Sequence, residues 1–188
     1  MNNVDCQTFL VVVNFMAEGF SRMDGSADDI SIPALVDYLR QAHIYFLDYC
    51  LPAIRRKLIE AIDCSQDDVS FLILKFFDGY MREVRKHMEY EEKTVFKYVD
   101  TLIHGNAPKN YQISTFSKHH DQVGERLTEL KNIIIKYCPA KANTNVLNAA
   151  LFDIYACEEG LESHCKVEDY LFVPAILKLE RRMRENEK

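Results

Sequence analysis

The sequence predicts an all-α protein whose architecture is an up-down-up-down four-helix bundle. It contains only six glycines and five prolines among 188 residues, too few for the many tight turns of an all-β fold. Apolar residues recur at helical spacing through four long blocks, and short runs of helix-breaking residues separate these blocks. Long helices joined by short loops favour antiparallel neighbours, and hence a bundle.

The first predicted element is a short helix over residues 5–20 that precedes the bundle. It places Phe9, Val12, Val13 and Met16 on one side, and this apolar side must pack on the bundle or on another chain, as in a homodimer. We expect residues 1–30 to form this N-terminal helix and a linker, which the family resemblance described below implies to be a remnant of a small N-terminal domain, and residues 31–188 to form the bundle.

The four bundle helices have start and stop signals in the sequence. Ser31 and the polar run 143–145 are N-caps, and Gly105 ends the second helix. Kinks are expected at Pro52 and Pro174, because proline interrupts the hydrogen bonding of a helix. The expected bounds are about 31–62, 67–104, 111–137 and 143–183.

Composition excludes several classes of protein. The 23 basic residues against 29 acidic ones give a net charge of −6 without a clustered basic surface, so nucleic acid is not an expected partner. The longest uncharged apolar stretch, residues 8–17, is about half the length that spans a membrane. The N-terminus lacks the basic start of a secretory signal, and the six cysteines contain no C-x-x-C pair, which predicts buried free thiols in a cytoplasmic protein.

Each bundle helix carries a histidine on its apolar stripe, and two of the helices also carry a glutamate there. Any one of these histidines, taken alone, is more often a satisfied core residue than a metal ligand. The two inward carboxylates change this balance, because burying a carboxylate costs several kcal/mol unless a cation or a proton compensates it. No Lys or Arg shares the stripe near either glutamate, so a bound cation is the expected partner. The six residues are His43, His87, Glu91, His120, His164 and Glu168.

The spacing of these residues repeats. His87 follows His43 by 44 residues, and His164 follows His120 by the same 44. In both copies a glutamate stands four residues after the second histidine, on the same helix face. Four imidazoles and two carboxylates meeting in a bundle core suit a pair of iron or manganese ions, which each carboxylate could bridge through its two oxygens.

Over about residues 32–179 this pattern resembles the hemerythrin-like, or HHE cation-binding, domain. Four segments are more closely similar to the di-iron proteins that repair iron–sulfur clusters. They are Leu35-Val36-Asp37-Tyr38-Leu39 leading to His43 and Leu51-Pro52, His87-Met88-x-x-Glu91-Glu92, His120-Asp121-x-x-Gly124-Glu125, and His164-x-x-x-Glu168-Asp169 with Leu171-Phe172-x-Pro174.

The resemblance implies a hemerythrin-like fold in which the same six residues are the ligands of two iron ions in an oxo- or carboxylate-bridged centre. It also implies a role in nitrosative or oxidative stress, with oxygen, nitric oxide or peroxide as small ligands and damaged iron–sulfur proteins as partners. Oxygen-carrying hemerythrins place two histidines one turn apart on the third helix, whereas Phe116 and Gly124 flank His120 at that spacing. This difference disfavours a reversible oxygen carrier. The second hypothesis is a sensor of oxygen, nitric oxide or iron without turnover, and the third is a metal-free structural bundle.

Several other polar residues have alternative readings. His119 could replace His120 as the ligand, and His104 is expected to be structural at a helix C-terminus. Glu92 and Asp169 could orient a ligand histidine. Tyr45, Tyr80 and Tyr98 are predicted in the core, where one could donate a hydrogen bond beside the metals, and Cys157 is predicted to serve packing. A ferritin-like site needs Glu-x-x-His on two helices, and Val84 and Leu161 occupy the required glutamate positions.

Overall fold

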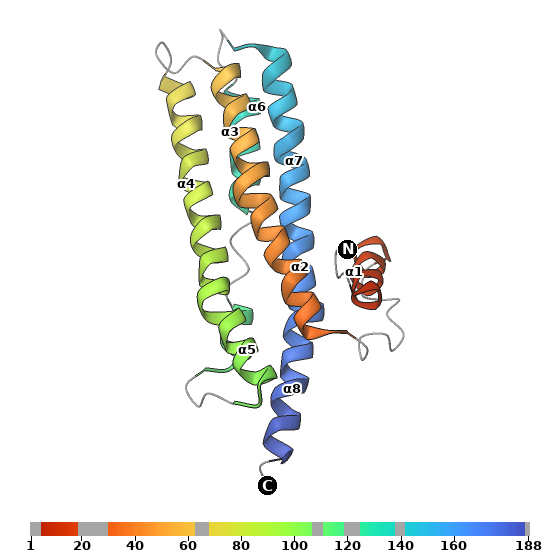
Figure 1. The fold of residues 1–188 in the computed structure, drawn as a ribbon. Coiled ribbons are helices and arrows are strands. Elements are labelled where there is room, and N and C mark those ends of the chain that lie inside the picture. Colours follow the sequence, from red (N-terminus) through yellow and green to blue (C-terminus); the bar gives the residue numbers. More distant parts are fainter. Residues whose placement is uncertain are drawn as a thin grey trace. The chain divides into compact units, whose positions relative to one another are not determined.

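The computed structural model describes residues 5–18, 30–62, 68–106, 111–118, 125–137 and 142–186, and its regular elements in these ranges are all helices (Figure 1). The prediction of an all-α protein is confirmed. Across these ranges no helix has both the length and the apolar character that crossing a membrane requires.

Most of the predicted helices are interrupted by short segments of another helical type. Segments η3, η4 and η6 are π-helical, and η5 is a 3₁₀ helix. The elements in chain order are α1 (Cys6–Glu18), α2 (Ile32–Ile44), η3 (Tyr45–Cys50), α3 (Leu51–Ala61), α4 (Asp68–Tyr90), η4 (Glu91–Val95), α5 (Phe96–Ile103), η5 (Ile113–Lys118), α6 (Glu125–Lys136), α7 (Thr144–Val167), η6 (Glu168–Phe172) and α8 (Val173–Asn186).

The third predicted helix differs from the continuous α-helix expected over residues 111–137. Its first described part is the 3₁₀ helix η5, which the Thr115 N–H opens by donating to the Gln112 carbonyl at 3.0 Å. The run Ile113-Ser114-Thr115 explains this, because β-branched residues and serine have low α-helix propensity. The α-helix α6 covers 125–136, and the intervening residues lie outside the described ranges.

The predicted cap residues hold the helix ends. Gly105 follows α5 with a φ of 81°, a left-handed conformation that glycine adopts without a steric penalty. Its N–H donates to the Leu102 carbonyl at 3.0 Å, and the N–H of Asn106 donates to Thr101 at 2.9 Å, which closes the last turn as a Schellman motif. At helix starts, side-chain oxygens of the predicted caps Ser31 and Asn143 accept the N–H of Ala34 and Val146, three residues ahead. Asp5, which was not predicted as a cap, accepts the Thr8 N–H in the same way.

The chain forms two compact units, of which the first comprises residues 1–42, 89–120 and 163–188. Its core is apolar and aromatic. Phe172 stacks edge-on against Phe96 and Phe116, with ring centroids 5.8 and 6.4 Å apart. These rings lie in one buried cluster with Leu35, Leu39, Val95, Val99, Ile113, Leu171 and Ile176.

Helix α1 belongs to the first unit, and one of the four residues on its predicted apolar side is buried. Val11, Val12 and Phe15 are buried, together with Thr8, whose hydroxyl accepts the Ser31 N–H at 2.9 Å. Val12 is a member of the predicted apolar side, whose other members, Phe9, Val13 and Met16, are exposed. Because apolar residues occupy most positions of this helix, the pattern does not select one face.

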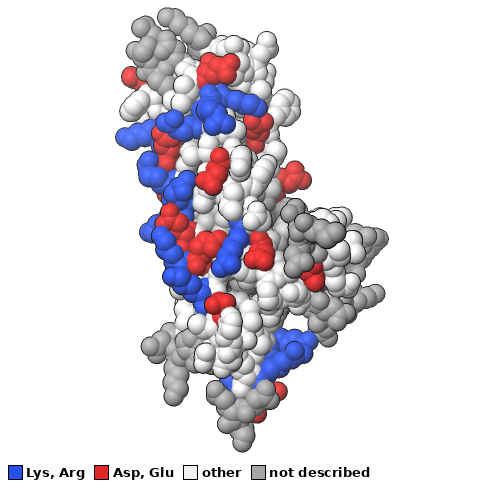
Figure 2. Space-filling view, in the orientation of Figure 1, with Lys and Arg blue, Asp and Glu red and all other residues white. Residues whose placement is uncertain are grey.

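The second unit comprises residues 43–88 and 121–162, and four ion pairs link its helices in a closed cycle. Arg55 of α3 binds Asp78 of α4 through two hydrogen bonds of 2.6 and 3.1 Å. The other three pairs join α4 to α6, α6 to α7, and α7 back to α3; they are Glu83–Arg126, Lys131–Glu158 and Asp153–Lys57. Basic and acidic side chains are accordingly interspersed on the face that Figure 2 shows.

The cysteines are only partly buried. Cys157 is buried, as predicted, whereas Cys50 and Cys165 are only half-buried. Cys6 is exposed, and the prediction is wrong there because Cys6 stands two residues before Thr8 and so faces away from the buried side of α1. Cys64 and Cys138 lie outside the described residues.

Candidate metal centre

Four of the six predicted ligands lie together in the structure. Each of His43, Glu91, His164 and Glu168 offers a ligand atom, and these atoms all lie within 4.8 Å of one another. All four residues are buried, and both glutamates are completely inaccessible, with 0 % exposure. Two imidazoles and two carboxylates therefore converge at a dry position, although they are separated by up to 125 residues in sequence.

Both glutamates of this group begin a π-helical segment. In η4 the Phe96 N–H donates to the Glu91 carbonyl, and in η6 the Val173 N–H donates to the Glu168 carbonyl, in each case five residues back. A π turn contains one more residue than an α turn, and such turns are frequent at functional sites. The backbone of each glutamate thus anchors the widened turn where its side chain joins the group.

A third π segment, η3, begins two residues after His43 and ends before a proline. The Leu51 N–H donates to the Phe46 carbonyl, and Pro52 follows. Segment η6 likewise ends before Val173 and Pro174. Proline cannot bond to the carbonyl four residues back and its ring clashes with it, so a preceding π turn accommodates the chain. At both prolines, where kinks are expected, the structure has a π turn just before the proline, and the helix continues as α3 and α8.

His164 and Glu168 adopt the one-turn spacing predicted from the sequence, with His164 Nε2 3.4 Å from Glu168 Oε1. Burial raises the pKa of the Glu168 carboxyl well above its usual 4.5, and the charge of Glu91 and then of Asp169 raises it further. The fold therefore brings two carboxylates together in a place that penalises their negative charge. A cation bound by both would remove this penalty.

The donor set fits a transition-metal ion. Imidazole nitrogen together with carboxylate oxygen suits iron and manganese, and the two oxygens of each carboxylate allow one side chain to contact two ions. The group contains no thiolate, which disfavours a structural zinc site. The residues present therefore fit the cation-binding role that the sequence predicts.

The remaining predicted ligands are placed less closely. His87 is half-buried one turn before Glu91 on α4, with its Nε2 atom inaccessible to solvent, and it is not among the four residues that converge within 4.8 Å. His120 and its alternative His119 lie outside the described residues. The assignment of His87 and His120 as ligands remains a prediction.

Other residues singled out in the sequence have different surroundings from the metal group. Glu92 accepts a hydrogen bond from Arg40 Nε at 3.2 Å. Tyr80 and Tyr98 are buried as predicted, but Tyr45 is 56 % exposed, because it precedes the inward Phe46 and packs its ring edge-on against that residue. His104 lies at the end of α5, where its Nδ1 bonds to the Asp100 carbonyl at 2.8 Å.

One buried carboxylate, Glu180, is not among the residues predicted from the sequence. Glu180 of α8 is 6 % exposed and accepts hydrogen bonds from the Tyr98 hydroxyl at 2.5 Å and the Ile113 N–H at 2.9 Å. Arg184 Nη2 lies 3.6 Å from its other oxygen. The signal was available, since Glu180 stands four residues after the buried Ile176 and so continues its stripe.

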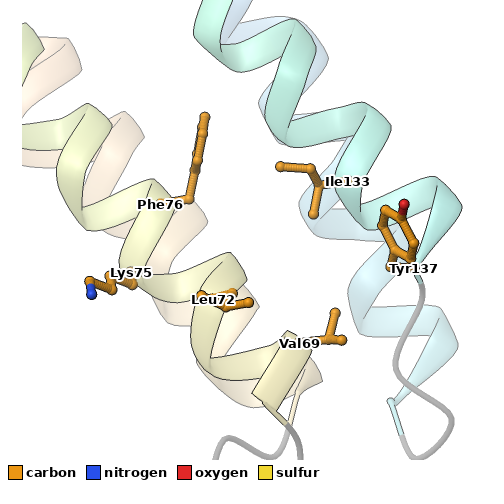
Figure 3. Close-up of a pocket in the computed structure, with 6 residues that line it drawn as sticks. All are labelled: Val69, Leu72, Lys75, Phe76, Ile133 and Tyr137. Carbon is orange, nitrogen blue, oxygen red and sulfur yellow. The ribbon is translucent and has the colours of Figure 1, made fainter.

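The second unit also contains an apolar pocket, which is separate from the predicted chemistry. Figure 3 shows its walls, with side chains from the start of α4 facing others from the end of α6. It contains none of the six predicted ligands. Its lining residues are Val69, Leu72, Lys75, Phe76, Ile133 and Tyr137.

Comparison with known proteins identifies the family. Residues 34–176 match the model of the hemerythrin HHE cation-binding domain, which covers most of the chain. Neither the curated proteins nor the solved structures contain a significant match. The matched region includes all four converging residues and spans the helices from α2 to α8. The chain is therefore a hemerythrin-like protein, an all-α member of the HHE cation-binding family with a buried His/Glu group able to bind metal.

Proposed function

We propose that this protein holds a non-haem di-iron centre and acts in the repair of iron–sulfur clusters or in the response to nitric oxide and oxidative stress. The observation that carries the di-iron part is the convergence of His43, Glu91, His164 and Glu168 within 4.8 Å in a fully buried position. The repair role is supported by the similarity of the ligand-bearing segments to cluster-repair proteins.

The chain contributes ligands, charge and shielding. Glu91 and Glu168 would supply two negative charges that offset those of the cations, and His43 and His164 would supply neutral nitrogen ligands. We add His87 and His120 to the set, because their positions complete the 44-residue repeat. Bound iron would supply Lewis-acid and one-electron chemistry toward oxygen, peroxide or nitric oxide.

Metal analysis tests the centre itself. Protein purified anaerobically and reconstituted with iron should hold about two iron ions per chain, as expected for a carboxylate-bridged pair in a bundle. Parallel reconstitution with manganese measures the preference between the two metals. Fewer than about one ion of either metal per chain after reconstitution would contradict the proposal.

A separate assay tests the repair role. A cluster-dependent enzyme is inactivated with nitric oxide, and its recovery is measured with the iron-loaded protein and with the Glu168→Ala variant. Recovery with the wild type alone supports repair. Equal recovery with both proteins would show that the iron centre is not responsible.

The exposed side of α1 favours a sensor as the second candidate function. Phe9, Leu10 and Met16 are each at least 50 % exposed, and such a surface suits contact with another chain. Sedimentation under nitrogen, oxygen and nitric oxide would separate the candidates. A monomer–dimer equilibrium that shifts with the gas, without recovery of the damaged enzyme, favours sensing over repair.

A further inference from the structure

Two cysteines that are distant in sequence meet in the second unit. Cys50 ends η3 and Cys157 lies near the middle of α7, and each thiol shifts the pKa of the other as a hydrogen-bonding neighbour. Both are free thiols in the structure. A disulfide requires neighbouring cysteines whose Cβ atoms do not point apart, so the alignment of the two helices decides whether this pair can form one.

Contacts on both sides of the pair fix its alignment. Before Cys50, the Phe46 ring packs so closely on Gly160 that a Cβ there would lie 3.3 Å from two ring carbons. After Cys50, Lys57 Nζ lies 2.5 Å from Asp153 Oδ2. Because residue numbers rise on one helix as they fall on the other, η3–α3 and α7 run antiparallel here, and Cys50 faces Cys157 between two anchored positions.

The two sulfurs have different surroundings. Cys157 is only 2 % exposed, whereas Cys50 is half-buried and so within reach of a small solute. Hydrogen bonds from Cys157, and from the exposed Tyr45 hydroxyl, lower the pKa of the Cys50 thiol. The hydrogen bond to Cys50, together with burial, raises the pKa of Cys157. Thiolate character and access thus both favour Cys50 as the nucleophile.

We propose that Cys50 and Cys157 are a redox-active dithiol that hydroperoxides oxidise to an intramolecular disulfide, with Cys50 attacking the peroxide and Cys157 resolving the product. This activity needs no metal, and it concerns residues outside the His/Glu group. The expected oxidant is a small hydroperoxide, such as hydrogen peroxide, that can reach a half-buried sulfur.

The chemistry proceeds in two balanced steps. The Cys50 thiolate attacks one peroxide oxygen, so that a sulfur–oxygen bond forms, the oxygen–oxygen bond breaks, and the other oxygen leaves as an alcohol or water after taking a proton. The sulfur of Cys157 then attacks Cys50, the sulfur–oxygen bond breaks, and water leaves with the Cys157 proton. Two thiols are oxidised and one hydroperoxide is reduced.

The test uses the full-length protein, treated with one equivalent of hydrogen peroxide with and without a chelator. Remaining thiols are then alkylated in denaturant and counted by mass spectrometry. Six thiols should be alkylated before oxidation and four after it, with a disulfide peptide joining Cys50 to Cys157. Thiol reductant should restore all six, because a disulfide is reversible where higher sulfur oxides are not.

Variants assign the two roles, with Cys165→Ser as the matched control. Cys50→Ser and Cys157→Ser should each lower the yield of disulfide at least about tenfold, whereas Cys165→Ser should leave it unchanged. In Cys157→Ser, dimedone should label Cys50 as a sulfenic acid, and in Cys50→Ser it should leave Cys157 unlabelled. Circular dichroism checks that each variant is folded.

Three results would overturn the proposal. One is a disulfide that joins other cysteines, such as Cys64 and Cys138. Another is the alkylation of all six thiols after oxidation, and the third is equal dimedone labelling in the Cys157→Ser and Cys165→Ser proteins. Because the readout is thiol mass rather than metal content, failure of the di-iron proposal would leave this test intact.

Discussion

The first unit buries carboxylates in two opposite ways. Glu180 is surrounded by groups that favour its negative charge, namely the Tyr98 hydroxyl, the Ile113 N–H and, at 3.6 Å, the Arg184 guanidinium. Glu168 instead lies where burial and the charge of Glu91 raise its pKa. The protein itself therefore supplies the partners of the Glu180 carboxylate, whereas it places the Glu168 carboxylate next to that of Glu91.

The difference separates a structural acid from a ligand. Tyr98 shows the effect of the structural one, because burial and the hydrogen bond to Glu180 raise the pKa of its hydroxyl, which therefore remains a proton donor. Glu168 is the opposite case, since the charged form of its carboxylate becomes favourable only when a cation binds beside it. Variants of the two glutamates should consequently fail in different assays.

The largest effect is expected on metal binding. Replacing Glu168 or Glu91 with Gln should weaken metal binding by more than about 100-fold, the upper range for a residue that only orients a ligand. Elemental analysis after reconstitution measures the loss. Glu180→Gln is the matched control and should keep the wild-type metal content; if it lost as much metal as Glu168→Gln, the two acids would not differ as described.

The next largest effect is expected on stability. Glu180→Ala removes the acceptor of two buried donors, and each orphaned donor costs about 1–3 kcal/mol. The free energy of unfolding of the metal-free protein should fall by about 2–6 kcal/mol, as measured in urea. Glu180→Gln, which keeps one oxygen acceptor, should lose less. Equal losses in the two variants would show that the hydrogen bonds are not what Glu180 contributes.

A pH series sharpens the comparison on the ligand side. In metal-free protein, folded Glu168 keeps a proton that the unfolded chain releases above about pH 4.5, so this residue costs increasing stability as the pH rises from there toward its folded pKa. Glu168→Gln cannot titrate. The variant should match the wild type at pH 4 and exceed it in stability at pH 7.

Thermal unfolding at several pH values measures that difference. Glu159→Gln, at an exposed position of α7, is the control and should follow the wild type at every pH. A Glu168→Gln protein that ran parallel to the wild type from pH 4 to pH 7 would contradict the raised pKa.

The smallest effect is expected at an exposed acid. Asp78 pairs with Arg55 through two short bonds, but both side chains are more than 30 % exposed, so Asp78→Asn should cost at most about 1 kcal/mol. Hydrogen bonding to Arg55 lowers the pKa of Asp78, so the contribution of the pair is present at neutral pH and is lost as the pH falls below 3.8. Urea unfolding at pH 7 and pH 3 checks both statements, and an equal cost at the two pH values would contradict the second.

The sequence predicted much of this molecule because its strongest signals are periodic. The helix-breaking residues at 105–108 and the polar caps placed helix ends within a few residues. Four of the six residues of the predicted histidine and glutamate repeat do converge; they are His43, Glu91, His164 and Glu168. A carboxylate four residues after a histidine is informative, because the α-helical period brings both to one side.

What the sequence did not predict depends on contacts between distant segments. Only Val12 of the predicted apolar side of α1 is buried, because an apolar residue stands at nearly every position and only packing, such as that of Phe15 on Tyr170, selects a side. Cys50 and Cys157 meet because helices that are over 100 residues apart in sequence align at that point. The π segments could not be predicted from the α-helical spacing of apolar residues, because each is only five or six residues long and lies within a longer helix.

The π turns also have a consequence for how members of this family are aligned. Each such turn is an α-helix with one residue inserted, so removing a residue from 91–95 or 168–172 would restore an ordinary helix and rotate every side chain beyond it by about 100°. A single-residue gap in either segment would therefore leave the glutamate and the histidine before it on one face, and would turn the buried residues beyond it, such as Tyr98 and Ile176, away from the core.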